Sequence, residues 1–331
     1  MKRIRLFTLI AVSALCLTAC GSTTDSANKV ISVTGNGQVT SDPASQVNTN
    51  PGTSSGSATG TRDNSPVVLQ PEAAGTTVYS CPVASIDASH ASQGYIMVEY
   101  TGSVSKVKLQ INSPTGTTYN YNLTSGNGYE VFPLSGDGKY TVGVLENASG
   151  NEYYRVLTES FEVTLENPFG PYLYPNQYVW FTQESACVSK AACLAEGYST
   201  DLEVVTSVFE YVVNHIAYDY DLAANVSSGY LPNPDHTLSC QAGICLDYAS
   251  LMAAMLRSQG IPTRLEVGYA GTAYHAWIST YISDIGWVSG IIYFDGQSWS
   301  IMDPTFAANN SASAVKEFIG DGDNYSTKYI Y

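Results

Sequence analysis

The chain has 331 residues, of which 44% are apolar and 13% are charged, so it can form a packed core and is long enough for two ordinary domains. Its formal charge of −15 at pH 7 comes from 14 basic and 29 acidic side chains. This balance excludes a basic nucleic-acid-binding surface and electrostatic binding to anionic lipid as default functions. We therefore expect a globular protein with no nucleic-acid partner.

The first 19 residues predict an export signal. Three basic residues among the first five precede the apolar run Leu6–Leu17, which is too short to span a bilayer as a helix. The run ends in Leu-Thr-Ala-Cys20, which resembles the lipobox of bacterial lipoproteins. The resemblance implies cleavage before Cys20 and lipidation of its sulfur. We therefore expect an extracytoplasmic protein anchored to the bacterial cell membrane, at the cell surface.

The segment 20–76 has a composition typical of disorder. It is rich in Ser, Thr, Gly, Asn, Asp and Pro and has few large apolar side chains. Such a segment cannot bury enough apolar surface to offset the entropy lost on ordering. We predict a disordered tether between the membrane anchor and the folded part of the chain.

Residues 77–166 are predicted to form an antiparallel β-sandwich. Val107, Leu109 and Ile111 alternate with polar residues, which is the pattern of a strand with one buried face. Further strands are expected near 94–101, 117–123, 129–134 and 139–146, separated by turns rich in Gly and Ser. Short strands at this spacing favour a sandwich of the immunoglobulin or fibronectin type III class. We expect this domain to act as a spacer or an adhesion module.

The pattern changes after Asn167-Pro-Phe-Gly-Pro171, which we interpret as a domain boundary. Apolar residues then recur at helical spacing near 202–213 and again from Cys245 to the helix-ending Gly260. Short apolar strands follow at about 264–269, 274–282, 288–294 and 298–302. Helices followed by an antiparallel sheet predict an α+β domain over 167–331, so the chain as a whole is expected to be multidomain.

Three residues of this second domain have the chemistry of a thiol-dependent site. Cys245 begins a predicted helix, where backbone N–H groups and the helix dipole stabilise a thiolate and lower its pKa. His275 lies within an apolar strand, from which an imidazole can reach the sulfur. Asp303 ends a later strand and could orient that imidazole. Asp247, in the first turn of the helix, is expected to cap backbone N–H groups rather than react.

The order Cys245, His275-Ala-Trp and Asp303-Pro-Thr resembles the bacterial transglutaminase-like core, a papain-related fold, over about 167–310. The segments 216–222 and 260–264 share this resemblance. It implies that Cys245 is the nucleophile, His275 the general base and acid, and Asp303 the orienting carboxylate of acyl transfer through a thioester. Water would complete the hydrolysis of a peptide or amide bond, and a lysine amine would complete a crosslink.

We expect protease-like hydrolysis first and crosslinking second, with a protein or a cell-wall peptide as substrate and no cofactor. The backbone N–H of Cys245 would bind the oxyanion together with one side-chain donor. Tyr218 and Tyr220 are the candidates for this donor. The alternative is a non-catalytic module that binds cell wall or protein and keeps the triad as a relic.

A metal site is not expected. His236, which we place in a Pro-rich loop, together with Cys240, Cys245 and His275 offers nitrogen and sulfur ligands, but their spacing matches no compact zinc motif. The four remaining cysteines that follow the lipobox could form disulfides outside the cell. Four cysteines can pair in three ways, and the sequence does not indicate which of the three is formed. These cysteines are Cys81, Cys187, Cys193 and Cys240.

Overall fold

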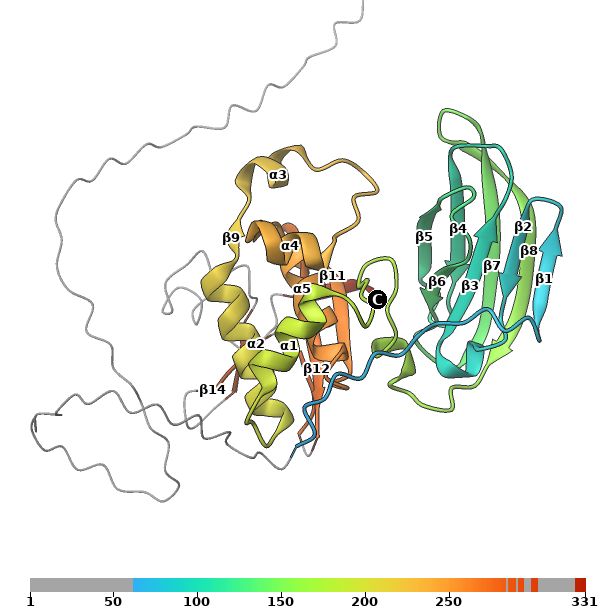
Figure 1. The fold of residues 1–331 in the computed structure, drawn as a ribbon. Coiled ribbons are helices and arrows are strands. Elements are labelled where there is room, and N and C mark those ends of the chain that lie inside the picture. The colour runs from blue at the N-terminus through green and yellow to red at the C-terminus, as the bar shows by residue number, and fades with distance from the viewer. Residues whose placement is uncertain (1–61, 284, 290, 295–298, 303–324) are drawn as a thin grey trace, which may run out of the picture. The chain divides into compact units, whose positions relative to one another are not determined.

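The computed structural model describes residues 62–283, 285–289, 291–294, 299–302 and 325–331 (Figure 1). Two of the predicted functional residues, Cys20 and Asp303, lie outside the described residues. The predicted signal peptide 1–19 also lies outside them. Among the described residues, no helix has both the length and the apolar character needed to cross a membrane.

Eight strands between residues 78 and 163 form two antiparallel sheets of four strands each. The strand order is β1-β2-β3-β6 in one sheet and β5-β4-β7-β8 in the other. The elements are β1 (Val78–Cys81), β2 (Ala84–Asp87), the 3-10 helix η1 (Ala91–Gln93), β3 (Tyr95–Tyr100), β4 (Val107–Asn112), β5 (Thr118–Leu123), β6 (Glu130–Pro133), β7 (Gly138–Ser149) and β8 (Glu152–Val163). We call these eight strands the two-sheet region.

The alternating sequence pattern explains how the two sheets pack. In β4, Val107, Leu109 and Ile111 are buried, whereas the residues between them are partly exposed. The inner faces meet where the rings of Tyr121 in β5 and Phe132 in β6 lie 4.8 Å apart. Since these two strands belong to different sheets, the apolar faces share one core.

The second region combines helices with a mostly C-terminal antiparallel sheet, which confirms the α+β prediction. Its sheet has the order β13-β12-β11-β16, and β14 and β15 form a separate pair. The helices are η2 (Gly170–Tyr172), α1 (Ala186–Ala195), α2 (Asp201–His215), α3 (Tyr220–Asn225), α4 (Pro234–Cys240) and α5 (Cys245–Arg257). The strands are β9 (Ala217–Tyr218), β10 (Ala242–Gly243), β11 (Thr263–Ala270), β12 (Ala273–Ile282), β13 (Gly286–Ser289), β14 (Ile291–Phe294), β15 (Trp299–Met302) and β16 (Tyr325–Ile330).

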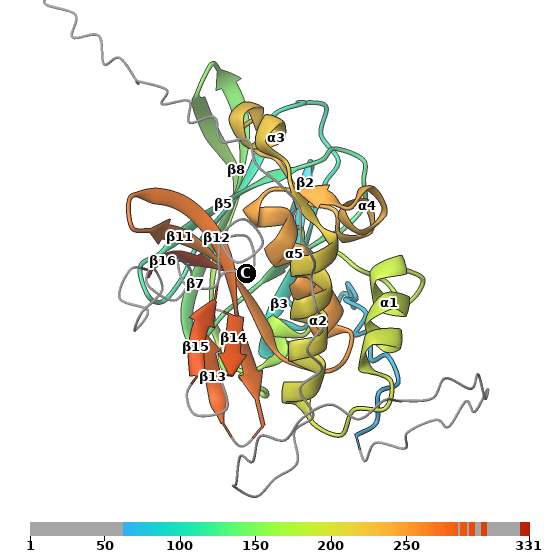
Figure 2. The ribbon, with the colours of Figure 1, turned by 90° about the vertical axis from the view of Figure 1, so that its left-hand side faces the viewer.

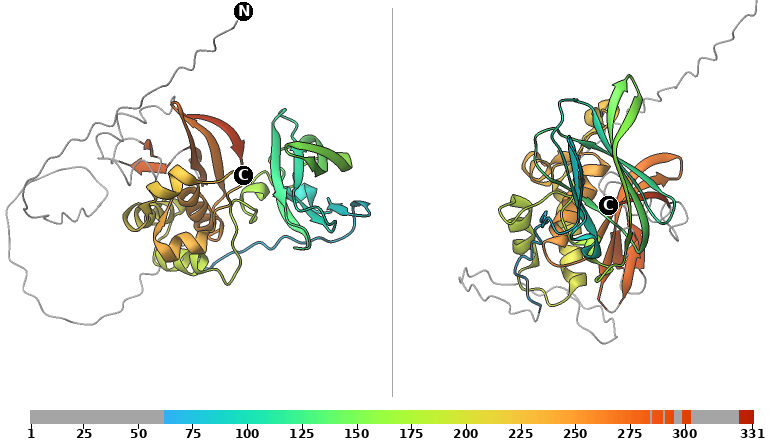
Figure 3. Two further views of the ribbon diagram at one scale, coloured as in Figure 1. Left: turned by 90° about the horizontal axis from the view of Figure 1, so that it is seen from above. Right: turned by 90° about the vertical axis from the view of Figure 1, so that its right-hand side faces the viewer.

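Helix α5 lies at the centre of this region. It is buried along nearly its whole length, which fits a helix that is apolar around most of its circumference. Helices α1, α2 and α4 contact it, and strands β11 and β12 contact it as well. Figures 2 and 3 show the helices gathered on one face of the β11–β12–β16 sheet. The core therefore fixes the start of α5 relative to β12.

A buried cation joins α5 to its surroundings. Arg257 is 1% exposed, and its guanidinium donates to the carbonyl oxygens of Thr263 at 2.9 Å, Tyr174 at 2.7 Å and Tyr331 at 2.8 Å. Burial lowers the pKa of Arg257 to about 9, so the side chain stays charged at neutral pH. These three bonds connect α5 to β11, to the segment that precedes α1 and to the end of β16.

Two sequence expectations are corrected here. His236 lies in α4 and not in a loop, because Pro234 stands at the first turn of the helix, where its missing N–H costs nothing, and Asn233 caps the helix. Residues 62–76 belong to the predicted tether but have fixed partners. Arg62 pairs with Asp201 of α2 at 2.8 Å, and the N–H of Val67 donates to the carbonyl of Ser258 at 2.7 Å. The prediction of a disordered tether is therefore wrong for residues 62–76. Their composition is typical of disorder and does not reveal these contacts.

Candidate functional site

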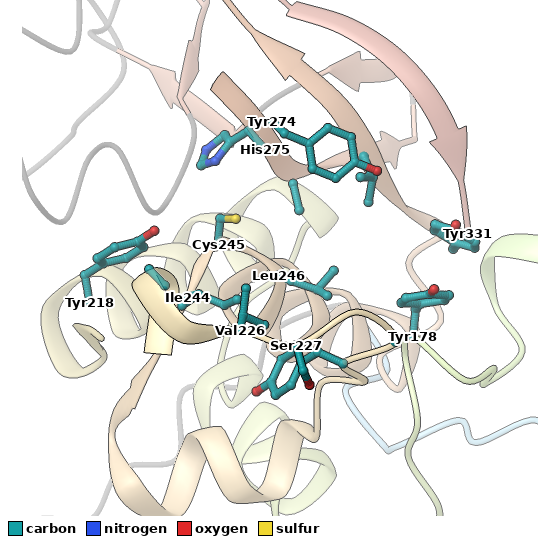
Figure 4. Close-up of a pocket in the computed structure, with 15 residues that line it drawn as sticks. Tyr178, Tyr218, Val226, Ser227, Ile244, Cys245, Leu246, Tyr274, His275 and Tyr331 are labelled. Atoms are coloured by element: carbon teal, nitrogen blue, oxygen red, sulfur yellow. The ribbon is translucent and has the colours of Figure 1, made fainter. Parts of the chain in front are cut away.

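A cavity of about 320 Å³ opens at the first turn of α5 (Figure 4). Cys245 and His275 both line it, and Figure 4 shows their side chains directed into the same space from α5 and β12. The structure thus brings together two of the three residues that the sequence predicts for the triad. The other lining residues are Tyr178, Tyr218, Ala223, Val226, Ser227, Gly229, Tyr230, Ile244, Leu246, Val267, Tyr274, Ala276 and Tyr331.

The position of Cys245 is fixed by the way α5 begins. Ile244 is the last extended residue, and its N–H donates to the Asp247 carboxylate at 2.8 Å. The other oxygen of that carboxylate accepts the Tyr230 hydroxyl at 2.8 Å. Asp247 is 2% exposed and acts as the predicted cap. Burial raises the pKa of Asp247, although both hydrogen bonds favour its charged form.

The loop between α3 and α4 is attached to the site through the same carboxylate. Tyr230 lies in this loop, which also supplies Val226, Ser227 and Gly229 to the cavity wall. Burial, followed by the hydrogen bond to Asp247, raises the pKa of Tyr230. The Asp247 carboxylate therefore joins the first turn of α5 to the loop that encloses the cavity.

His275 is positioned by close packing of the sheet. It lies opposite Gly268 in the antiparallel pairing of β12 with β11. A Cβ atom on Gly268 would lie 2.0 Å from the Ser326 carbonyl oxygen of β16. Only glycine therefore allows β16 to pass this close to β11 at the level of His275. His275 is partly buried, and Asp303, the predicted orienting residue, lies outside the described part of the chain.

Of the two candidate oxyanion donors, the structure places one at the cavity. Strands β9 and β10 pair in parallel, and the N–H of Asp219 donates to the Gly243 carbonyl at 2.9 Å. This pairing sets Tyr218 beside the segment that leads into Cys245, where it lines the cavity. Tyr220 is 68% exposed and is not a lining residue, although its ring meets that of Tyr218 edge-on at 5.0 Å.

The sequence does not single out the other tyrosines of the cavity. Tyr178 and Tyr331 stack with ring centroids 4.2 Å apart, and Tyr274 precedes His275 on β12. Together with Tyr230, these residues come from four separate segments. Their only sequence signal is the count of 25 tyrosines, which does not indicate which of them meet.

The described cysteines are all free thiols. Cys187 is buried, and burial raises the pKa of its thiol, whereas Cys193 and Cys240 are exposed. Within the described ranges, no three His, Cys, Asp or Glu side chains are grouped closely enough to hold a metal ion. The lining of the cavity contains one thiol and one imidazole, which suits nucleophilic chemistry at a carbonyl.

Comparison with known proteins places this site in context. Residues 176–290 match the transglutaminase-like superfamily. The UPF0252 protein of Methanocaldococcus jannaschii is 32% identical over 92 residues, which cover 24% of this chain and 26% of that protein. The match thus spans about a quarter of the length of that relative.

Three solved structures are similar at low identity. A candidate cysteine protease from Cytophaga hutchinsonii is 17% identical with a TM-score of 0.33, covering 70% of this chain and 69% of that one. LapG of Legionella pneumophila is 20% identical with a TM-score of 0.26, covering 44% and 81% of the two chains. Red sea bream transglutaminase is 12% identical with a TM-score of 0.26, covering 64% and 48%.

Proposed function

We propose that the transglutaminase-like domain matched over residues 176–290 is a cysteine-dependent enzyme that acts on peptide or amide bonds. Cys245 is the nucleophile, His275 is the general base and acid, and Asp303 orients the imidazole. Hydrolysis is the reaction that we favour for this site, and transfer to a lysine amine is the alternative. The observation that carries the proposal is the meeting of Cys245 and His275, from a helix start and a neighbouring strand, in one cavity.

The reaction follows from these two groups. His275 accepts the Cys245 proton as the sulfur attacks the carbonyl carbon of the substrate. The C–N bond then breaks, and His275 returns the proton to the leaving amine, which leaves a thioester on Cys245. Water attacks the thioester, with His275 as base, and releases a carboxylic acid and the free thiol. A lysine amine in place of water gives an isopeptide bond.

The charge that develops on the carbonyl oxygen needs hydrogen-bond donors. The N–H of Cys245 belongs to the first turn of α5, whose N–H groups have no partner within the helix. Tyr218 is our candidate for the second donor, because β9 holds it at the cavity beside the segment that enters α5. The Asp247 carboxylate is already bonded to Ile244 and Tyr230, so it supports the turn rather than the reaction.

We also propose that the two-sheet region, within a domain over 77–166, is a sandwich of the immunoglobulin or fibronectin type III class. Its strand order supports this assignment. When the strands are counted from β2, the first, second and fifth (β2, β3 and β6) share one sheet, and the third, fourth, sixth and seventh (β4, β5, β7 and β8) share the other.

The remaining part of the proposal is the membrane anchor. Lipidation of Cys20 would tether the enzyme to the outer face of the cell membrane, and loss of membrane association in Cys20→Ala tests it.

The catalytic proposal is tested with a proteome-derived peptide library. The full chain, the Cys245→Ala variant and the Cys240→Ala variant are incubated with the library, and new peptide ends and crosslinks are identified by mass spectrometry. Cys240 is the matched control, because it is an exposed thiol near the site that does not line the cavity. We expect products from the wild type and from Cys240→Ala only. Products that persist in Cys245→Ala would overturn the role of Cys245 as nucleophile, and an absence of products from the wild type would favour the non-catalytic binding module.

A further inference from the structure

A second pocket, of about 280 Å³, adjoins the catalytic cavity. The two share four lining residues: Tyr178, Gly229, Tyr274 and Tyr331. Tyr274 directly precedes His275 and is 59% exposed. A substrate that occupies the cavity at Cys245 can therefore continue past Tyr274 into this second pocket.

The far wall of the second pocket comes from the two-sheet region. Lys108 of β4 and Asn120 and Asn122 of β5 line it. Strand β5 is an edge strand, because its sheet has the order β5-β4-β7-β8. Its residues alternate strictly, so that Tyr119 and Tyr121 are buried while both asparagines are exposed on the other face.

The asparagines are held close to the catalytic region. A Cβ atom on Gly229 would lie 2.5 Å from Nδ2 of Asn122, so the loop that encloses the cavity passes directly beside this amide. Gln177 Nε2 donates to the main-chain carbonyl of Asn122 at 2.9 Å, which connects β5 to the segment before Tyr178. Lys108 lines the same wall as the two asparagines, and its ammonium lies 5.0 Å from the ring centroid of Tyr153.

We infer that Asn120 and Asn122 bind the main chain of an extended polypeptide whose scissile bond lies at Cys245. Two residues that are two positions apart on a strand present their amides about 7 Å apart, and an extended peptide repeats its outward N–H and C=O groups at the same interval. A primary amide both donates and accepts, so each asparagine can bond to one such unit. Gln110 Nε2 already donates to Asn120 Oδ1 at 3.2 Å, which fixes that amide and leaves its NH₂ group for the substrate.

This inference rests on the proposed hydrolase and adds its substrate class. The substrate is an extended polypeptide with several residues on one side of the scissile bond, and short amides lack the part that the asparagines bind. Because main-chain atoms are recognised, the side chains of the substrate on that side are only weakly selected. The two-sheet region thereby becomes a part of the substrate site.

The test compares a long peptide with truncated versions of the same sequence. A peptide cleaved by the full chain is taken from the library and synthesised with eight residues and in versions truncated from each end. The quantity measured is the ratio of kcat/KM for the long peptide to kcat/KM for each truncated one. In Asn120→Ala/Asn122→Ala we expect one of these ratios to fall about tenfold, the effect of losing two ordinary hydrogen bonds. Each single variant should lower the same ratio about threefold.

Asn151→Ala is the matched control, since Asn151 is an exposed asparagine of the β7–β8 turn and lines neither pocket. We expect it to leave every ratio unchanged. Binding of the long peptide to the Cys245→Ala chain provides a second measurement that does not depend on turnover, and it should weaken about tenfold in the double variant. Unchanged ratios and unchanged binding would overturn the inference, and the hydrolase proposal would stand if Cys245→Ala still abolishes cleavage. If the wild type cleaves no peptide of the library, both the inference and the hydrolase proposal are overturned.

Discussion

The hydrogen bond from Tyr230 to Asp247 is the contact that attaches the cavity loop to the first turn of α5. Tyr230→Phe removes the hydroxyl and keeps the ring. The bond is 2.8 Å long and its acceptor is 2% exposed, so water cannot replace the lost donor. Hydrogen bonds to charged, buried acceptors contribute about 1.5–3 kcal/mol, and we expect the free energy of unfolding at pH 7 to fall by that amount.

The pH dependence of this loss follows from the carboxylate. Burial raises the pKa of Asp247 in the folded protein, while the bond from Tyr230 lowers it by favouring the charged form. A raised folded pKa means that Asp247 contributes most to stability below its unfolded value, and this contribution declines as pH rises through the folded pKa. Tyr230→Phe raises the folded pKa further. The loss caused by the variant should therefore be small below the folded pKa of Asp247, where the carboxyl is protonated, and larger above it, where the carboxylate is charged.

Urea unfolding followed by circular dichroism, at several pH values, measures these free energies. Tyr198→Phe is the matched control, because Tyr198 is exposed in the segment between α1 and α2, and a change below about 0.5 kcal/mol is expected there. In an Asp247→Asn background, Tyr230→Phe should cost about 1–2 kcal/mol less than it does alone. An equal loss in both backgrounds, or a loss that does not vary with pH, would refute the reasoning.

Three further predictions concern other parts of the chain. Gly268→Ala should lower the free energy of unfolding by about 1–3 kcal/mol in the same urea assay, because the new Cβ atom meets a main-chain oxygen of β16 at 2.0 Å; an unchanged midpoint would contradict this. Arg62→Gln should lower the free energy of unfolding by about 0.5–1.5 kcal/mol at pH 7, because it removes the ion pair with Asp201. Hydrogen bonds, including that from Arg62, keep the folded pKa of Asp201 below its usual value despite burial. The loss should therefore shrink as the pH falls through that folded pKa. Alkylation of the native protein, mapped by mass spectrometry, should label the exposed Cys193 and spare the buried Cys187; labelling of both at similar rates would show that α1 opens readily.

The sequence predicts the part of the site that comes from regular elements. Cys245 opens a helix because apolar residues recur after it at helical spacing, and His275 lies in a strand because it stands in a short apolar run; both elements are present, as α5 and β12. The order of the elements also follows, since turn residues separate them. The sequence does not indicate helix α4, because a proline within a short segment is typical of a loop, although Pro234 begins this helix.

Other features depend on tertiary contacts that have no local signal. The sequence does not predict strand β1, which has no fully buried face. It does not predict β16 either, because the sequence Tyr-Ser-Thr-Lys-Tyr-Ile is mostly polar. Tyr230, Tyr178 and Tyr331 reach the cavity from loops and from the end of the described chain, where no periodicity applies. Asp201 and Gln259, the partners that join Arg62 to the second region, are more than a hundred residues distant in sequence, so no composition argument could have placed it.

The central claim is that His275 activates the thiol of Cys245. The most direct test is the rate of iodoacetamide alkylation of each cysteine in the full chain at pH 6, resolved by mass spectrometry, in the wild type and in His275→Ala. Cys193 and Cys240 serve as internal references, because both are more exposed than Cys245. Since the thiolate is the reactive form, we expect Cys245 to react faster than both references in the wild type and to lose this advantage in the variant. A Cys245 that reacts no faster than the exposed thiols, or whose rate does not depend on His275, would contradict the account.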